Sequence, residues 1–333
     1  MYCLISTFNK TFDELGLIYF IPSFLESEIK IGQIIEAPIW TKTEIAVVLE
    51  IWNLEKLNIL NINEKKIKSI INIKNENIFL NEKRIILSKF IASHYFTHIH
   101  NSIWLFFPKN LREKIIKDKI ILTNPLSWIL SPSQKKEATI LKYIFNFDKK
   151  LSEKQEDIFE KINKSKENKF LLHWVTGSWK TEIYIKLIKE ELNKGKQSLL
   201  LIPEIILANQ LESRLKNVFG KNILIINSSI TEANKTKAWV SINSGETKII
   251  IWTRSALFYP YNNLWLIIID EEHDNSYKSD QAPRYNSIEI ANKITELNWN
   301  KLLLASWTPS INSMYKAVKG KYKLLKLLEK FDI

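Results

Sequence analysis

The chain has 333 residues, of which 45% are hydrophobic and 25% are charged, a composition typical of a globular protein with two or three domains. It contains no apolar stretch of membrane-spanning length and no secretion signal at its start, so we expect a cytoplasmic protein with no membrane partner. The single cysteine, Cys3, excludes internal disulfides and cysteine-based zinc sites within these residues.

Positive charge is concentrated in one stretch. The formal net charge is +12, and residues 101–150 contain 10 basic and 4 acidic residues, which gives a net +6 (10 − 4). Such an excess suits contact with nucleic-acid phosphates. A solvated lysine-rich surface would give the same excess in a chain that is rich in Lys, Asn and Ile throughout. Charge alone leaves both interpretations open.

The pattern of elements divides the chain into three parts. Residues 1–105 predict a small β-rich domain with strands near Leu17–Ile21, Gln33–Pro38 and Glu44–Ile51, followed by a helix at Glu82–His94. Residues 106–150 are basic and rich in breakers, so they predict a connector or a reduced domain. From residue 151 to the end, apolar strands alternate with amphipathic helices, which predicts an α/β fold whose parallel sheet is covered on both faces. The predicted elements are strands at Phe170–His173, Ser198–Ile202, Ile223–Ile226, Lys248–Ile251, Leu264–Asp270 and Lys301–Ala305, and helices at Lys180–Lys194, Ile205–Val218 and Ser287–Leu297.

A candidate phosphate-binding loop follows the strand Phe170–His173. Its sequence, WVTGSWKT at 174–181, matches the pattern G-x-x-x-x-G-K-[ST] except that Trp174 and Trp179 replace the two outer glycines. In such loops, backbone N–H groups and a helix N-terminus cradle the phosphates. Lys180 would then reach the β and γ phosphates, and the Thr181 hydroxyl would hold Mg²⁺. By itself the segment could equally be an ordinary strand–loop–helix connection.

Acidic residues follow the apolar strand Leu264–Ile269. An aspartate at the carboxyl end of a buried parallel strand is well placed to bind Mg²⁺, which predicts this role for Asp270. Glu271 could position or deprotonate a water molecule. The spacing between the Lys-Thr loop and the sequence D-E-E-H, which ends at His273, resembles the layout of a superfamily 2 helicase lobe.

Three further segments fit this layout. Gln155 precedes the first strand of the α/β part, where such motors place an adenine-reading glutamine, although Ser152 and Gln155 also form the pattern of a helix capping box. Thr253, Arg254 and Ser255 follow a strand and offer donors to DNA phosphates. The run at 306–308, Ser-Trp-Thr, occupies the place of the S-A-T coupling motif.

Several runs resemble the primosomal replication-restart helicases, the PriA family. They are LLHWVTGSWKTEIY, LLLIPEI, SGETKIIIWTRSALF, NLWLIIIDEEHDNSYKSDQAPRY and LLLASWTPS, with a looser likeness of LIYFIPSFL and IKIGQIIEAPIW to that family's domain for DNA 3′ ends. The resemblance implies a RecA-like lobe (a P-loop NTPase) behind a DNA-binding domain, and ATP-dependent 3′→5′ unwinding at stalled forks. It implies forked or single-stranded DNA, primosome proteins and single-strand-binding proteins as partners.

The resemblance also implies roles for individual residues. Lys180, Asp270, Glu271 and His273 would carry ATP hydrolysis, with Thr181 and Asp270 on Mg²⁺. A loop containing Tyr277, Lys278, Arg284 and Tyr285 would couple DNA contact to hydrolysis, together with Thr253, Arg254 and Ser255. The nucleotide would be bound by Gln155, Trp174, Val175, Thr176, Gly177, Ser178, Trp179, Lys180, Thr181 and Glu182.

Tryptophan replaces glycine at several family positions. They are Trp40, Trp104, Trp174, Trp179, Trp252 and Trp265, and Trp307 replaces a small residue, whereas the family often has tryptophan at Trp239 too. The whole chain has 7 glycines and 11 tryptophans. We hypothesise that the gene reads UGA as glycine and that the printed tryptophans record those codons. The alternative is an ATP-inactive relative that keeps the fold and binds DNA.

The chain ends soon after the Ser-x-Thr run, so we expect the second motor lobe and the zinc module of the family to be missing. Such a fragment should bind nucleotide weakly and should not translocate. Another superfamily 2 motor, such as a restriction-translocase subunit, is a further alternative, against which the front domain and the P-R-Y run argue.

Overall fold

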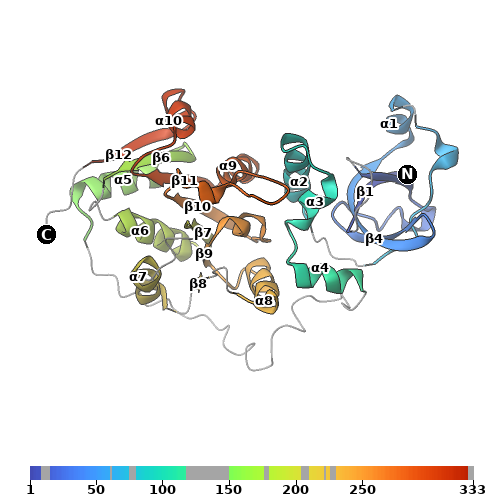
Figure 1. Ribbon diagram of the computed structural model, residues 1–333, viewed down its shortest axis with the longest axis horizontal. Helices are drawn as coiled ribbons and strands as arrows, with labels where there is room; N and C mark the ends of the chain where they lie inside the picture. Colours follow the sequence, from blue (N-terminus) through green and yellow to red (C-terminus); the bar gives the residue numbers. More distant parts are fainter. Residues whose placement is uncertain are drawn as a thin grey trace. The chain divides into compact units, whose positions relative to one another are not determined.

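The computed structural model describes residues 1–8, 16–60, 62–74, 80–117, 150–175, 180–203, 210–220, 223–225 and 230–328. These residues form two compact units. One contains the described residues up to 117 together with Gln281–Tyr285, and the other contains the remaining described residues from 150 onward. Both units appear in Figure 1, coloured along the chain.

The first unit is built on a five-stranded antiparallel sheet. Its strands are β1 (Tyr2–Thr7), β2 (Leu17–Phe20), β3 (Ile34–Ile39), β4 (Lys42–Trp52) and β5 (Asn72–Ile73), in the spatial order β2-β1-β4-β3-β5. Alternate residues such as Cys3 and Ile5 on β1, and Ala46 and Val48 on β4, enter one core. This period of two is what places one face of a sheet against a core.

The described part of the first unit also contains four α-helices and the 3₁₀ turns η1 (Ser23–Leu25) and η2 (Glu64–Lys66). The helices are α1 (Leu54–Ile59), α2 (Glu82–His94), α3 (Ile99–Trp104) and α4 (Lys109–Ile116). The side chains of Asn53 and Asn81 cap α1 and α2. The ring of Phe107 packs edge-on against Phe8 of the first unit at 5.4 Å between centroids. The described residues after 105 therefore pack as part of this unit.

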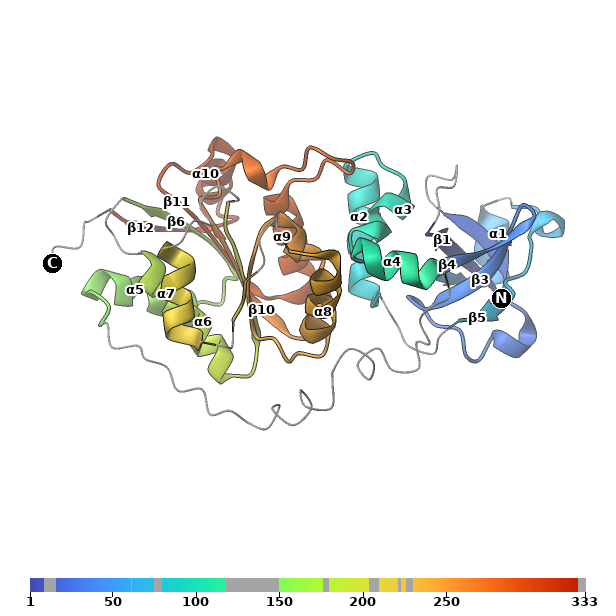
Figure 2. The same ribbon diagram turned by 60° about the horizontal axis from the view of Figure 1, so that its bottom comes forward.

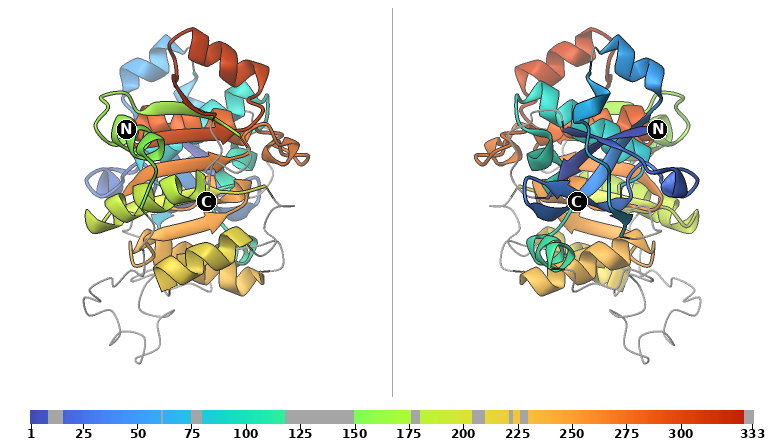
Figure 3. Two further views of the ribbon diagram at one scale, coloured as in Figure 1. Left: turned by 90° about the vertical axis from the view of Figure 1, so that its left-hand side faces the viewer. Right: turned by 90° about the vertical axis from the view of Figure 1, so that its right-hand side faces the viewer.

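The second unit contains a seven-stranded parallel sheet. Its strands are β6 (Lys169–Trp174), β7 (Gln197–Leu201), β8 (Ile223–Ile225), β9 (Ile249–Trp252), β10 (Leu264–Asp270), β11 (Lys301–Ser306) and β12 (Lys323–Leu327), in the order β12-β6-β11-β10-β7-β9-β8. The view at the left of Figure 3 shows these strands one above the other. The central strands are continuously apolar because both faces are covered.

Helices cover both faces of the parallel sheet. They are α5 (Glu153–Asn163), α6 (Lys180–Asn193), α7 (Gln210–Phe219), α8 (Glu232–Asn243), α9 (Ser287–Asn298) and α10 (Ile311–Val318), with 3₁₀ turns η4 (Arg254–Phe258) and η5 (Asn275–Tyr277). Crossovers through α6 and α7 run in one direction across the sheet, and those through α8, α9 and α10 run back. Right-handed connections therefore place α6 and α7 on one face and α8, α9 and α10 on the other, as Figure 2 shows.

The observed architecture confirms the predicted fold class, a parallel α/β lobe preceded by a small β-rich domain. The capping box predicted at the start of α5 is also present, with Gln155 N–H donating to Ser152 Oγ and Ser152 N–H donating to Gln155 Oε1. The sequence patterns missed the strands β1, β5 and β12 and the helices α1, α3, α4, α8 and α10. No helix in the described part of the chain is long and apolar enough to span a membrane.

Candidate functional site

The predicted catalytic residues meet at the carboxyl edge of the parallel sheet. Strand β10 lies beside β11, and β11 lies beside β6, with Asp270 opposite Ala305 and Ser306 opposite His173. All three strands therefore end at the same edge, and α6 begins there at Lys180. In open α/β sheets this edge is where ligands bind.

Lys180 links the two acidic residues of the D-E-E-H sequence. Its Nζ lies 2.5 Å from Asp270 Oδ1 and 2.6 Å from Glu271 Oε1, and all three side chains are largely buried. One positive charge thus lies between two negative charges in a site of low solvent exposure. Removing any one of these three side chains would leave a buried charge without its partner, so they depend on one another.

Glu271 has an unusual backbone and an unusual side chain. Its φ is +48°, in the left-handed region that non-glycine residues rarely adopt, and such conformations gather at functional sites. Burial raises the pKa of the Glu271 carboxyl above its ordinary value, with Asp270 adding to the rise and Lys180 opposing it. Oε2 is buried and accepts no hydrogen bond from the described residues, and His273 Nδ1 lies 3.8 Å away. A raised pKa and an oxygen without a hydrogen bond are properties that a general base needs.

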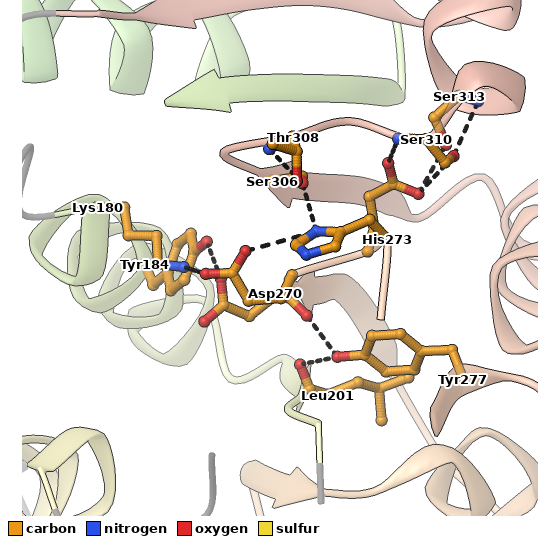
Figure 4. A network of polar contacts seen from close by, with 12 residues as sticks. Lys180, Tyr184, Leu201, Asp270, His273, Tyr277, Ser306, Thr308, Ser310 and Ser313 are labelled. Atoms are coloured by element: carbon orange, nitrogen blue, oxygen red, sulfur yellow. Dashed lines mark hydrogen bonds and ion pairs between the residues drawn. The ribbon is translucent and has the colours of Figure 1, made fainter. Parts of the chain in front are cut away.

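Two tyrosines that the sequence did not single out for this purpose hold Asp270 in place (Figure 4). The hydroxyl of Tyr184 donates to Asp270 Oδ1 at 2.9 Å. The hydroxyl of Tyr277 lies 2.5 Å from the Asp270 carbonyl oxygen and 3.1 Å from the Leu201 carbonyl oxygen, so it bridges the ends of β10 and β7. Tyr184 follows Lys180 by four residues and so shares its helix face, but this spacing does not predict that its hydroxyl reaches Asp270.

The rest of the D-E-E-H sequence contacts the segment after β11. His273 Nδ1 lies 2.7 Å from Ser306 Oγ, which also accepts the Thr308 N–H at 3.0 Å. This contact brings the predicted coupling motif onto the acidic sequence.

Glu272 anchors the start of α10. Its carboxylate is buried and accepts from Ser310 N–H at 2.6 Å, Ser310 Oγ at 3.0 Å and Ser313 Oγ at 2.9 Å. The acidic sequence is therefore tied to both the 306–308 run and the helix after it.

The predicted nucleotide-binding residues fall into three groups. Thr176, Gly177, Ser178 and Trp179 lie outside the described residues. Trp174 is buried under Lys180, whose Nζ lies 3.7 Å from the ring centroid, while Val175 donates its N–H to Leu327 O and Thr181 lies in the first turn of α6. Glu182 turns away, because Arg214 binds its Oε1 through Nε at 3.0 Å and Nη2 at 2.6 Å. Gln155 is buried in the capping box of α5.

The predicted DNA-facing residues also divide. Lys278 and Arg284 are exposed, as a contact with DNA needs. Tyr277 and Tyr285 are buried, which differs from the expectation that their rings face DNA. Tyr277 is buried because its hydroxyl bridges the ends of β10 and β7. Thr253, Arg254 and Ser255 follow β9, and Arg254 Nη1 donates to the Ser276 carbonyl oxygen at 2.7 Å.

The tryptophans at family glycine positions have no common environment. Trp40 has φ +53° and is 84% exposed, and Trp299, which the sequence did not single out, ends α9 with φ +57° and is 74% exposed. Left-handed positions of this kind favour glycine. Trp104 donates to Phe8 O at 2.9 Å and Trp265 lies beneath Lys196 at 3.2 Å, whereas Trp307 is half exposed. The side chain of Trp252 lies outside the described residues.

The donor set suits Mg²⁺ bound together with a nucleotide. Asp270 and Thr181 offer the hard oxygen ligands that Mg²⁺ takes, and Mg²⁺ usually completes its shell with water and phosphate oxygens. Within the described ranges, no group of three or more His, Cys, Asp or Glu side chains could hold a metal ion by itself. A site completed by phosphates fits the residues present.

The parallel sheet, the lysine that begins α6 and the D-E-E-H sequence after β10 define the ATP-binding lobe of a superfamily 2 helicase. Residues 148–310 match the family described as type III restriction enzyme, res subunit, and residues 6–108 match the 3′ DNA-binding domain (3′BD) family of PriA. The chain belongs to the PriA family of replication restart proteins.

Two relatives show the extent of the match. The chain is 35% identical to the replication restart protein PriA of Rickettsia conorii over 95% of this chain and 44% of the relative. It is 42% identical to the PriA protein of Bacillus subtilis over 53% of this chain and 22% of the relative. The chain thus spans less than half the length of the curated relatives it matches. Among solved structures it is similar to RecG bound to a three-way DNA junction, with a TM-score of 0.42 and 18% identity over 71% of this chain and 34% of that one.

Proposed function

We propose that this chain provides the DNA-binding front domain and the first ATP-binding lobe of an ATP-dependent 3′→5′ DNA helicase that restarts replication at stalled forks. The proposal depends on one observation above all. A lysine at the start of a helix, two carboxylates after a buried strand and a histidine–serine contact meet at one edge of the sheet. The 3′ DNA-binding domain family of the first unit supports DNA as the substrate class, and we propose the cytoplasm as the compartment.

The chain's own residues suggest how the site works. Mg²⁺, bound together with ATP, supplies positive charge that offsets the phosphate oxygens. Lys180 would exchange Asp270 and Glu271 for phosphate oxygens, and Thr181 and Asp270 would hold the metal ion. Glu271, freed from Lys180, would accept a proton from the attacking water, for which a raised carboxyl pKa is favourable. Because His273 contacts Ser306, a movement of the D-E-E-H sequence on nucleotide binding would also move the 306–308 run.

DNA contact is assigned to exposed basic residues and to the front domain. Lys278 and Arg284 would bind phosphates, and Arg254 would do so after leaving the Ser276 carbonyl oxygen. The first unit would bind a DNA 3′ end, as its family description states. Primosome and single-strand-binding proteins are the partners we propose for the whole protein. Gln155 would read adenine if its side chain left the capping box.

Nucleotide binding tests the proposal. The full chain would be made with W174G and W179G and compared with the tryptophan form, using a fluorescent ATP analogue and Mg²⁺. We expect the glycine form to bind about ten-fold tighter or better, since glycine allows the close backbone approach that phosphate needs. K180A in the glycine form is the control and should abolish this gain.

The outcomes separate the two candidate functions. Trp174 beneath Lys180 favours an ATP-inactive DNA-binding protein if the tryptophans are real. That alternative predicts DNA binding by both forms and nucleotide binding by neither. Absence of nucleotide binding in the glycine form would refute the helicase proposal, and UGG codons at 174 and 179 would refute the codon hypothesis alone.

A further inference from the structure

Tyr184 makes a contact that the phosphate-loop pattern does not require. It lies on α6 one turn after Lys180, its side chain is fully buried, and its hydroxyl donates to Asp270 Oδ1 at 2.9 Å (Figure 4). Lys180 Nζ lies 2.5 Å from the same oxygen. One face of α6 therefore supplies two donors to a single carboxylate oxygen.

The two donors differ in what binding of a nucleotide would do to them. Lys180 carries a charge that phosphates would attract away from Asp270. Tyr184 carries no charge, so phosphates would not attract its hydroxyl away from Asp270. Its ring is fully buried on α6, and this packing keeps the hydroxyl beside Asp270 Oδ1. The Tyr184 contact can thus outlast the Lys180 contact.

The contact also distinguishes the two oxygens of Asp270. Oδ1 accepts both hydrogen bonds, and Oδ2 accepts none from the part of the chain that the structure describes. Residues that hydrogen-bond a metal ligand fix its orientation, and their loss commonly weakens metal binding. A buried tyrosine hydroxyl also needs some partner simply to satisfy its polar group. An experiment must therefore separate positioning of Asp270 from satisfaction of Tyr184.

We propose that Tyr184 is a positioning residue for the metal ion that accompanies the nucleotide. Its hydroxyl holds Asp270 by Oδ1 and keeps Oδ2 directed toward the metal ion after Lys180 has moved to the phosphates. This inference rests on the proposed function, because it needs a site for Mg²⁺ and a nucleotide.

The test is the Mg²⁺ dependence of nucleotide binding in the full chain carrying W174G and W179G. Y184F removes only the hydroxyl. Y322F is the matched control, since Tyr322 is also buried and its hydroxyl accepts a hydrogen bond from Asn292 Nδ2 at 2.6 Å instead of contacting Asp270. A fluorescent ATP analogue would be titrated at a series of Mg²⁺ concentrations and again in EDTA. Y184F should raise the Mg²⁺ concentration for half-maximal binding about ten-fold and change binding in EDTA less than about two-fold. Y322F should change neither.

Several results would overturn the inference. Mg²⁺ dependence in Y184F equal to that of its parent would do so, as would an equal loss with and without Mg²⁺, which a damaged pocket would give. D270N provides a second route that leaves Tyr184 unchanged: Tyr184 acts through Asp270, so D270N should raise the Mg²⁺ concentration for half-maximal binding by about ten-fold or more, and a near-normal dependence in D270N would refute the inference. If the parent itself binds no nucleotide, the proposed function falls and this inference falls with it.

Discussion

Replacing Trp40 by glycine should leave the first unit as stable as before or stabilise it by up to about 1 kcal/mol. Trp40 joins β3 to β4 with φ +53°, and the left-handed conformation costs a non-glycine residue about 1–2 kcal/mol. The side chain is 84% exposed, so of a tryptophan surface of about 250 Å² only about 40 Å² is covered, which is worth at most about 1 kcal/mol. The Lys68 Nζ contact is to the Trp40 backbone carbonyl oxygen, which glycine retains.

The change in the free energy of unfolding would be measured by chemical denaturation of the full chain, monitored by hydrogen exchange at the amides of β3 and β4. The matched control is W239G, because Trp239 is 3% exposed inside α8 and its loss should cost the second unit about 4 kcal/mol or more. The reasoning is refuted if W40G destabilises the first unit by more than about 1 kcal/mol, since Trp40 would then make a contribution that neither its exposure nor its backbone explains.

Three further predictions concern other polar side chains with several hydrogen-bond partners. Gln197 is fully buried and bonds Ile242 O, Thr247 O and the N–H groups of Asn262 and Asn263, so Q197L should cost about 3 kcal/mol or more in denaturant unfolding of the second unit, and a loss below about 1 kcal/mol would contradict this. Burial alone would raise the pKa of Glu50, but hydrogen bonds from Lys56, Lys89 and Trp52 lower it to about 2. The ionised carboxylate therefore adds to the free energy of unfolding above the unfolded pKa of about 4.3, and this stabilisation is lost as the pH falls through about 2. E50Q should cost the first unit about 1 kcal/mol at pH 7 and clearly less at pH 2, where about half of the Glu50 carboxyls are protonated in the folded state, and an equal cost at both would count against the ion cluster. E272A should speed hydrogen exchange at the first turn of α10 about ten-fold or more, because three donors lose their acceptor, and unchanged exchange there would show that Glu272 does not anchor the helix.

Local signals in the sequence predicted much of the fold. The helix at Glu82–His94 and the capping box at Ser152 and Gln155 are each encoded within a few neighbouring residues, and both are present. The continuous apolar runs predicted a parallel sheet, because only strands covered on both faces tolerate them. The strand β5 has two residues and is too short to show a pattern, and in β12 the residues Lys323 and Lys326 interrupt the apolar run that marks the other parallel strands.

The candidate site was less accessible to such signals. Lys180, Asp270, Glu271 and His273 could be found because each follows a strand at the end where parallel sheets bind ligands. The roles of Tyr277 and Tyr285 could not, since aromatic residues in a polar loop look alike whether they face DNA or the core. Only the buried hydroxyl of Tyr277, bonded to strand-end carbonyl oxygens, shows that this ring supports the site from within.

The sequence by itself determined the class of protein: a lysine at a helix start, two carboxylates after an apolar strand and a β-rich domain ahead of them identify a helicase lobe through short local patterns. The tertiary structure alone decided which side chains act on Asp270, because Tyr184 is 86 residues away from it along the chain. It also decided which tryptophans occupy left-handed positions, since φ depends on how a turn closes against the rest of the fold. Contacts between strand ends arise from the order of strands in the sheet, and that order is set by packing across the whole unit.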